Sequence, residues 1–313
     1  MRKGLWWSAQ IAVAAVVAVL VWRAAARNWT EFRSLHVTLA LKAGPLALSV
    51  LAVMVTYALQ IESWRRILAG WAQHLPYGKA ARIWLLVNLG RYVPGKVWSV
   101  AGLIVLAQRA GVEPWAAGAS AFAIQAVGLG TAVAVVAAAT PGAESPLRLA
   151  AAALVATATI GFLAWERGTR WLAGLAGRGG GVGRGSEFKP PKPLPLAAVA
   201  ESAGLTLASW GSYGLAFWLL ARGLGLPGSL SLPTAAGVFA LGYILGLLAL
   251  FAPGGVGVRE LVFIGLLTPA LGSGGAVALS VGSRVLLTLC EAAAPLGVLL
   301  VTGRTKEDMG VRT

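Results

Sequence analysis

The sequence contains few of the residues from which metal sites and hydrolytic centres are built. Among its 313 residues are one cysteine, Cys290, two histidines, His36 and His74, and a single aspartate, Asp308. One cysteine excludes an intramolecular disulfide and a cysteine-based zinc site, and one aspartate excludes a metal site built from several aspartates. No serine lies in a G-x-S-x-G motif with a plausible histidine partner. We therefore predict no metal, no cofactor and no enzymatic activity, with a glutamate general base as the disfavoured alternative.

Charged residues are also scarce, and most of them are basic. Only 12% of the residues are charged, 58% are hydrophobic and the mean hydropathy is +0.76. A chain this apolar is too hydrophobic for a soluble globule and is predicted to be an all-α polytopic membrane protein. Its net charge of +15 comes from basic residues that lie mostly between or at the ends of apolar stretches. In that position they set membrane topology, and without a soluble basic domain we predict no nucleic-acid partner.

Long apolar stretches predict about six full membrane spans, because a crossing needs about 20 residues. They lie at 5–22, 44–61, 114–140, 146–164, 195–222 and 275–302. A basic and aromatic stretch at 23–43 predicts a short interfacial helix. A Gly-rich stretch with excess Arg and Lys predicts a flexible cytoplasmic linker. The predicted organisation is a first membrane half, this linker, a second membrane half and a cytoplasmic tail, at 1–164, 165–192, 193–303 and 304–313.

Two further apolar stretches are interrupted in the middle. The first, 78–109, contains Pro94-Gly95, and the second, 233–268, contains Pro253-Gly254-Gly255. Proline removes an N–H group and glycine permits left-handed backbone, so each stretch is predicted to end one helix and begin another. Each resulting half is too short to span the bilayer. We therefore predict two re-entrant broken helix pairs, which is where membrane transporters place their binding sites.

The two broken pairs are predicted to be copies of one unit in opposite orientations. Each is preceded by a Leu-Pro pair and followed by a turn and a long span. Basic residues flank the first pair, whereas the flanks of the second, 223–232 and 269–274, carry no charge. The positive-inside rule then places the first pair at the cytoplasmic face and the second at the outer face of the plasma (inner) membrane, with both termini cytoplasmic. Eight full spans are the alternative.

Ionisable residues at membrane depth are the candidate site. A charge at the centre of a membrane helix costs about 2.5–3.5 kcal/mol, so it must be paired, hydrated or liganded. A basic side chain beside the N-terminus of a half-helix is a phosphate site. The predicted lipid-headgroup-binding residues lie at the two breaks: Arg91, Pro94, Gly95, Lys96, Pro253, Gly254, Gly255, Arg259 and Glu260.

Two more intramembrane residues, Arg284 and Glu291, share one stripe of the last span with Thr288 and are predicted to support the site. The alternative is structural. In it, the charged residues of the second half form an internal ion-pair cluster rather than a substrate site. Either Glu260 or Glu291 would also be the base in the disfavoured enzymatic interpretation.

The stretches NLGRYVPGKVWSVAGL (88–103) and FAPGGVGVREL (251–261) resemble the signature segments of the lysylphosphatidylglycerol synthase transmembrane region, a flippase-like integral membrane family. The resemblance covers roughly 45–302. Members with a soluble aminoacyl-transferase domain make and translocate lysyl-phosphatidylglycerol, and shorter members consist of the membrane region alone. Many relatives carry a Gly-Glu pair shortly after the first Pro-Gly, where this chain reads Val97-Trp98-Ser99. That departure leaves open whether the first hairpin recognises the same headgroup.

The resemblance implies a stand-alone flippase-type module without synthase activity. We expect it to translocate an anionic lipid, either a phospholipid or a polyprenyl-phosphate-linked precursor. The alternative is a non-transporting accessory subunit of a membrane glycosyltransferase or lipid synthase. The expected partner is therefore an anionic lipid, with a membrane enzyme as the possible second partner.

Overall fold

A computed structural model describes residues 39–92, 97–139, 146–165, 167–168, 193–226, 228–249, 255 and 257–301. Four predicted segments fall wholly or mostly outside these described residues. They are the span at 5–22, the interfacial helix at 23–43, the linker at 165–192 and the tail at 304–313.

The described part of the chain is all helical, with eight α-helices, one 3-10 turn and no strand. This confirms the predicted all-α class. Apolar stretches rich in Ala and Leu favour helix, and within a bilayer a helix satisfies its own backbone polar groups. The elements are α2 Ala43–Gly70, α3 Tyr77–Asn88, the 3-10 turn Leu89–Tyr92, α4 Val97–Arg109, α5 Pro114–Ala139, α6 Pro146–Ala164, α8 Leu196–Gly223, α9 Leu232–Leu248 and α10 Val258–Val301.

Three of the described helices are long and apolar enough to cross a membrane. They are α2, α5 and the Val258–Val298 part of α10. The bounds of α5, α6 and α8 agree with the predicted spans to within a residue or two. Both predicted breaks interrupt helices, the first between α3 and α4 and the second between α9 and α10. The membrane character and the helix breaks are therefore confirmed in this part of the chain.

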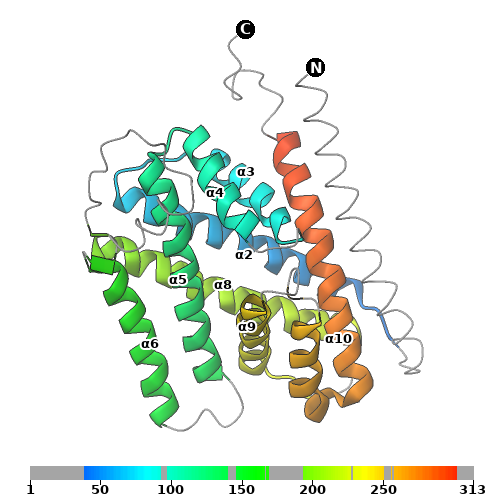
Figure 1. The fold of residues 1–313 in the computed structure, drawn as a ribbon. Helices are drawn as coiled ribbons and strands as arrows, with labels where there is room; N and C mark the ends of the chain where they lie inside the picture. Colours follow the sequence, from blue (N-terminus) through cyan, green and yellow to red (C-terminus); the bar gives the residue numbers. More distant parts are fainter. Residues whose placement is uncertain are drawn as a thin grey trace.

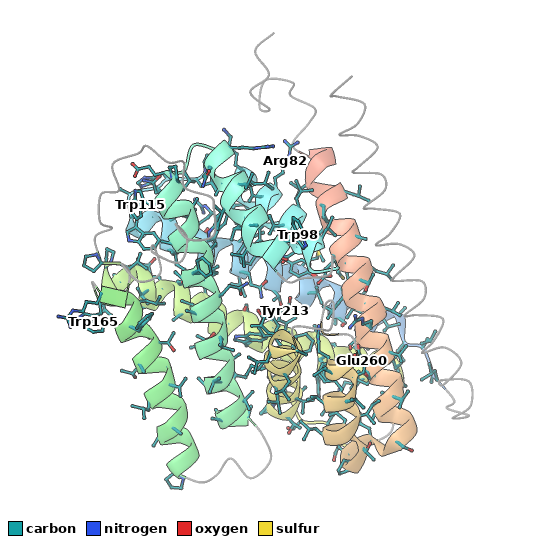
Figure 2. The ribbon with its side chains drawn as sticks, in the orientation of Figure 1. Arg82, Trp98, Trp115, Trp165, Tyr213 and Glu260 are labelled. Atoms are coloured by element: carbon teal, nitrogen blue, oxygen red, sulfur yellow. The ribbon has the colours of Figure 1, made fainter. Side chains whose placement is uncertain are left out.

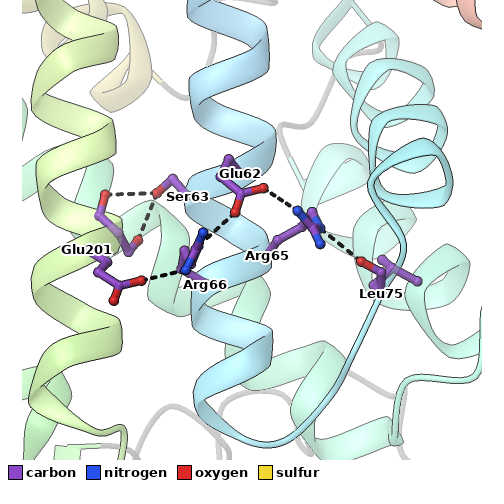
Figure 3. A network of polar contacts seen from close by, with 7 residues as sticks. Glu62, Ser63, Arg65, Arg66, Leu75 and Glu201 are labelled. Carbon is purple, nitrogen blue, oxygen red and sulfur yellow. Dashed lines mark hydrogen bonds and ion pairs between the residues drawn. The ribbon is translucent and has the colours of Figure 1, made fainter.

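Helix α2 runs further than the predicted span 44–61 and ends at Gly70. Its last turns are charged but remain helical because their side chains pair one turn apart. Arg66 Nε donates to Glu62 Oε1 at 2.7 Å, and Arg65 pairs with the other oxygen of the same carboxylate. Such i, i+3 and i, i+4 pairs support a helix. Figure 3 shows this group reaching the neighbouring helix α8, where Arg66 Nη1 donates to Glu201 Oε2 at 2.9 Å.

Helix α10 consists of two helices that meet at Gly272. This residue has φ 71° and ψ 165°, a conformation that is essentially confined to glycine. The sequence predicted a half-helix at 256–268, a turn at 269–274 and a span at 275–302. The structure keeps the break but reduces the turn to one residue, because Gly272 alone redirects the backbone.

Helices α2 and α8 lie antiparallel along their whole length. Lys42 N, just before α2, donates to Gly223 O at the end of α8 at 2.8 Å. Near the other end of α2, the hydroxyl groups of Ser63 and Ser202 are 2.8 Å apart. Small polar residues let two helices approach closely and bond across their interface. Figure 1 shows α3 and α4 on one side of this pair, and α9 with the first part of α10 on the other.

The two ends of each broken helix pair lie close together in space. The segment before α3 and the start of α5 are tied together, since Glu113 N donates to Gln73 Oε1 at 3.1 Å. In the second half, a Cβ atom on Gly228, before α9, would lie only 2.1 Å from Ala270 O, at the end of the first part of α10. The two backbones are therefore in contact. Because α3 follows α2 and α9 follows the antiparallel α8, the two pairs begin at opposite ends of the α2–α8 pair.

Candidate functional site

The ends of the broken helices meet at one cavity of about 190 Å³. Asn88 at the end of α3 and Ser99 in the first turn of α4 line it from the first break. From the second break it is lined by Leu247 at the end of α9 and by Arg259 in the first turn of α10. Helices α2, α5 and α8 complete the wall. The cavity thus joins two breaks that are far apart in the sequence.

Carboxamide side chains converge on this cavity. Gln60 in α2, Asn88 in α3 and Gln125 in α5 all line it, and each lies in or at the end of an apolar helix. The other two Asn or Gln residues in the described part of the chain, Gln73 and Gln108, lie in a loop and near the end of α4. Sequence analysis assigned none of these three residues to the site, although Asn88 begins the motif at 88–103. A polar side chain within an apolar span is costly to insert, and this was the signal that could have identified them.

Aromatic rings also line the cavity. The rings of Trp210 and Tyr243 meet edge to face with centroids 5.0 Å apart, and Tyr213 stacks on Phe239 at 4.7 Å. Figure 2 shows Tyr213 near the middle of the bundle. These offset and edge-to-face contacts are the favoured arrangements of aromatic rings and add about 0.5–1.5 kcal/mol per pair. The aromatic wall is therefore rigid.

Two tryptophan side chains of the first and second halves are fixed by hydroxyl groups of α5. Trp64 Nε1 in α2 donates to Ser120 Oγ, and Trp210 Nε1 in α8 donates to Thr131 Oγ1, both at 3.1 Å. A third tryptophan, Trp84, lines the cavity, and its buried Nε1 has no hydrogen-bond partner among the described residues. A buried N–H group without a hydrogen-bond partner is unfavourable, and this one is itself shielded from the cavity.

Arg259 is the one charged side chain among the described residues that line the cavity. Its guanidinium carbon lies 5.1 Å from the centroid of the Phe239 ring and 5.5 Å from that of Phe263. Cation–π contacts of this kind attract a cation to the faces of aromatic rings. The stem of the side chain lies against α9, since a Cβ atom on Gly246 would be 2.8 Å from Arg259 Cγ. Arg259, predicted as a headgroup ligand, is thus oriented at the cavity wall.

The predicted left-handed backbone at the second break is present. Gly255 has φ 71° and Gly257 has φ 87°. Gly255 is buried and also lies close to its neighbours, because a Cβ atom there would be 3.0 Å from Gly246 Cα and 3.3 Å from Arg259 Cδ. Gly257 faces open space. Both positions therefore need glycine because their backbone is left-handed. At Gly255 a side chain would also collide with neighbouring atoms, whereas at Gly257 it would not.

Glu260 is engaged within the protein through both carboxylate oxygens. Its Oε2 accepts from Gly257 N at 2.6 Å, as a glutamate in the third position of a helix does in a capping box. Its Oε1 accepts from Arg284 Nη1 at 2.8 Å, and the two side chains are only 15% and 17% exposed. This arrangement favours the ion-pair alternative for Glu260 and Arg284.

The remaining predicted residues are described only in part. Glu291 is 4% exposed and lies one helical turn after Leu287, which lines the cavity. Arg91 belongs to the 3-10 turn, but its side chain is not described. Four proline and glycine residues and one lysine fall outside the described residues: Pro94, Gly95, Lys96, Pro253 and Gly254.

The described residues contain no group of three or more His, Cys, Asp or Glu side chains that could hold a metal ion. Comparison with known families gives a match over residues 9–292, to the family described as the lysylphosphatidylglycerol synthase TM region. No curated protein matches the chain. The family match includes both breaks and every described residue that lines the cavity.

Proposed function

This chain belongs to the lysylphosphatidylglycerol synthase TM region family, a membrane module associated with lipids, and we propose that it moves an anionic lipid between the two leaflets. The observation that carries the proposal is a cavity lined by residues from both helix breaks, with Arg259 at its wall. A phosphate group suits this cation. In this proposal the protein is not an enzyme, and its partner is the lipid itself.

We propose that the two broken pairs are re-entrant and that the halves form an inverted repeat. Helix α3 has 12 residues, which at 1.5 Å per residue gives about 18 Å, well short of the roughly 30 Å hydrocarbon core. The contacts at the ends of each pair support a return to the side of entry. The antiparallel α2–α8 pair supports entry from opposite sides. Eight full spans would instead require each broken pair to cross the membrane once, with its two ends on opposite sides.

Cysteine labelling tests this architecture. We expect Cys in place of Gly78, in the first turn of α3, to react with an impermeant thiol reagent only after permeabilisation, and Cys in place of Ser229, before α9, to react in intact cells. Both positions are exposed, and Ser229 is preferable to Gly228, where a Cβ atom would clash with Ala270 O at 2.1 Å. A Cys290→Ala background removes the native thiol. Labelling of both positions from the same side would overturn the inverted repeat.

Reconstitution tests the activity. The purified chain in vesicles should move a tail-labelled phosphatidylglycerol between leaflets, and Arg259→Gln should slow this movement at least tenfold because the phosphate loses its cation. Arg109→Gln is the matched control, since Arg109 is exposed at the end of α4 and lies away from the cavity lining. A chain that moves no lipid but co-purifies with a membrane glycosyltransferase or lipid synthase would be the accessory subunit instead.

A further inference from the structure

The two ends of the α2–α8 pair differ in how their positive charges are compensated. At one end, Arg66 is paired with both Glu62 and Glu201. At the other end, Lys42 directly precedes α2, and Arg222 lies in the last turn of α8. Both side chains are exposed, and neither forms an ion pair with a described residue. Positive charge therefore remains uncompensated, within the described part of the chain, at this second end.

General rules of membrane proteins do not account for both of these cations. In the topology proposed above their end of the pair lies at the outer face, where basic residues are depleted. The helix dipole favours Arg222 at the C-terminal end of α8 but disfavours Lys42 at the start of α2. The first turn of α2 has no acidic residue to offset this lysine. An anion from outside the protein would offset both charges.

Backbone contacts bring the two cations to the same place. Lys42 N donates to Gly223 O at 2.8 Å, so Lys42 lies beside the residue that follows Arg222. The segments remain in contact further on, because a Cβ atom on Gly225 would lie 2.7 Å from Ala40 O. One cation belongs to each half of the chain. The position is therefore created by the α2–α8 contact and not by one helix alone.

The guanidinium group of Arg222 is held against an aromatic ring. Its central carbon lies 4.1 Å from the centroid of the Trp218 ring, closer than in the other described cation–π contacts. Trp218 is itself fixed, because its Nε1 donates to Leu230 O at 3.0 Å, just before α9. A guanidinium group carries five N–H donors and can stack on an aromatic face while it binds a phosphate. Arg222 is thus oriented beside the start of the second hairpin.

We propose that Lys42 and Arg222 bind the phosphate group of an anionic lipid in the outer leaflet. Charge complementarity carries the proposal, because two exposed cations without a described acidic partner attract the anionic headgroups of a membrane surface. Neither residue lines the cavity that contains Arg259. The site is therefore separate from the cavity and goes beyond the translocating function. Only its assignment to the outer leaflet rests on the topology proposed above.

A fluorophore attached at Gly44→Cys tests the site. A Cβ atom there would meet no other atom within 4 Å, so the label has room beside Lys42. The full-length chain, in a Cys290→Ala background, is reconstituted in phosphatidylcholine vesicles with a small fraction of spin-labelled lipid. At low salt, spin-labelled phosphatidylglycerol should quench the fluorophore roughly threefold or more as strongly as spin-labelled phosphatidylcholine. Equal quenching by the two lipids would overturn the proposal.

Charge variants locate the effect. Lys42→Gln combined with Arg222→Gln should reduce the ratio of the two quenching constants to about one, whereas Lys42→Arg combined with Arg222→Lys should preserve most of it. The matched control is a label at Gly78→Cys, which also has open space and lies in the first turn of α3. Its ratio should not change in the double glutamine variant. A ratio at Gly44 that survives the loss of both charges would contradict the assignment.

Two further measurements separate a lipid from a soluble anion, and this site from the proposed function. Inorganic phosphate should lower the quenching ratio no more than sodium chloride of equal ionic strength does. A larger loss with phosphate would assign the site to a soluble anion and overturn the lipid assignment. Phosphatidylglycerol enrichment without movement between leaflets would keep this site and remove the translocating function. Movement without enrichment would keep the function and remove this site.

Discussion

Two groups of paired charges in the described part of the chain lie in different surroundings. At one end of α2 and α8, Arg66 and Glu201 pair across the helices with side chains that are 48% and 52% exposed. At the second break, Glu260 and Arg284 pair with side chains that are 15% and 17% exposed. The chemistry is the same, but solvent screens the first pair and not the second. The exposed pair lies near the end of α2, and the shielded pair stabilises the conformation of the second helix break.

Arg284→Gln should have the largest effect on stability. It leaves the shielded Glu260 carboxylate without its charged partner, and the free energy of unfolding should fall by about 3–5 kcal/mol. Adding Glu260→Gln should restore most of it, because the amide oxygen can still accept from Gly257 N. Unfolding in detergent, followed by circular dichroism, measures both. If the double variant is no more stable than the single one, the pair is not the stabilising element.

An intermediate effect is expected for the glycines beside this pair. Gly255→Ala and Gly257→Ala both place a side chain on left-handed backbone, which costs roughly 1–2 kcal/mol. Only at Gly255 does the new Cβ also crowd Arg259 Cδ, at 3.3 Å. Both variants should therefore lose similar stability from the backbone, and Gly255→Ala should in addition lose anionic-lipid binding. Equal lipid binding by the two variants would show that the position of Arg259 does not matter.

Arg66→Gln should have the smallest effect. Its guanidinium lies in solvent between Glu62 and Glu201, both of which stay hydrated when it is removed. The unfolding midpoint should not change measurably at physiological salt. At low salt a small decrease is expected, because screening of exposed charges weakens as ionic strength falls. A loss as large as that of Arg284→Gln would mean that the exposed pair is as important as the shielded one.

Local sequence patterns predicted most of the described helices. Apolar length and turn chemistry placed α5 and α6, and Pro-Gly pairs placed both breaks, because these signals act within a few residues. The end of α2 was missed because its charged turns pair internally. The partner of Glu260 could not be predicted with certainty, since Arg284 lies 24 residues away and is brought close by the bend at Gly272.

The cavity was only partly predictable. Arg259 and Gly255 were identified because a charge and a glycine stand out beside a proline in an apolar stretch. The sequence did not identify the aromatic lining residues Trp210, Tyr213 and Tyr243. In a membrane span, the sequence alone does not distinguish an aromatic residue that lines a cavity from one that faces lipid. The carboxamides could have been found, since Gln60 and Gln125 are the only Asn or Gln residues of their predicted spans, 44–61 and 114–140.

The ion pair between Glu260 and Arg284 links the first part of α10 to the last span, so that the chain between these two residues forms a closed loop. The chain runs from Glu260 through the joint at Gly272 to Arg284, and the ion pair joins its two ends. The angle between the two helices at Gly272 cannot widen while this ion pair is intact. We therefore expect the first part of α10, which carries Arg259, and the last span to move together as long as this ion pair is intact.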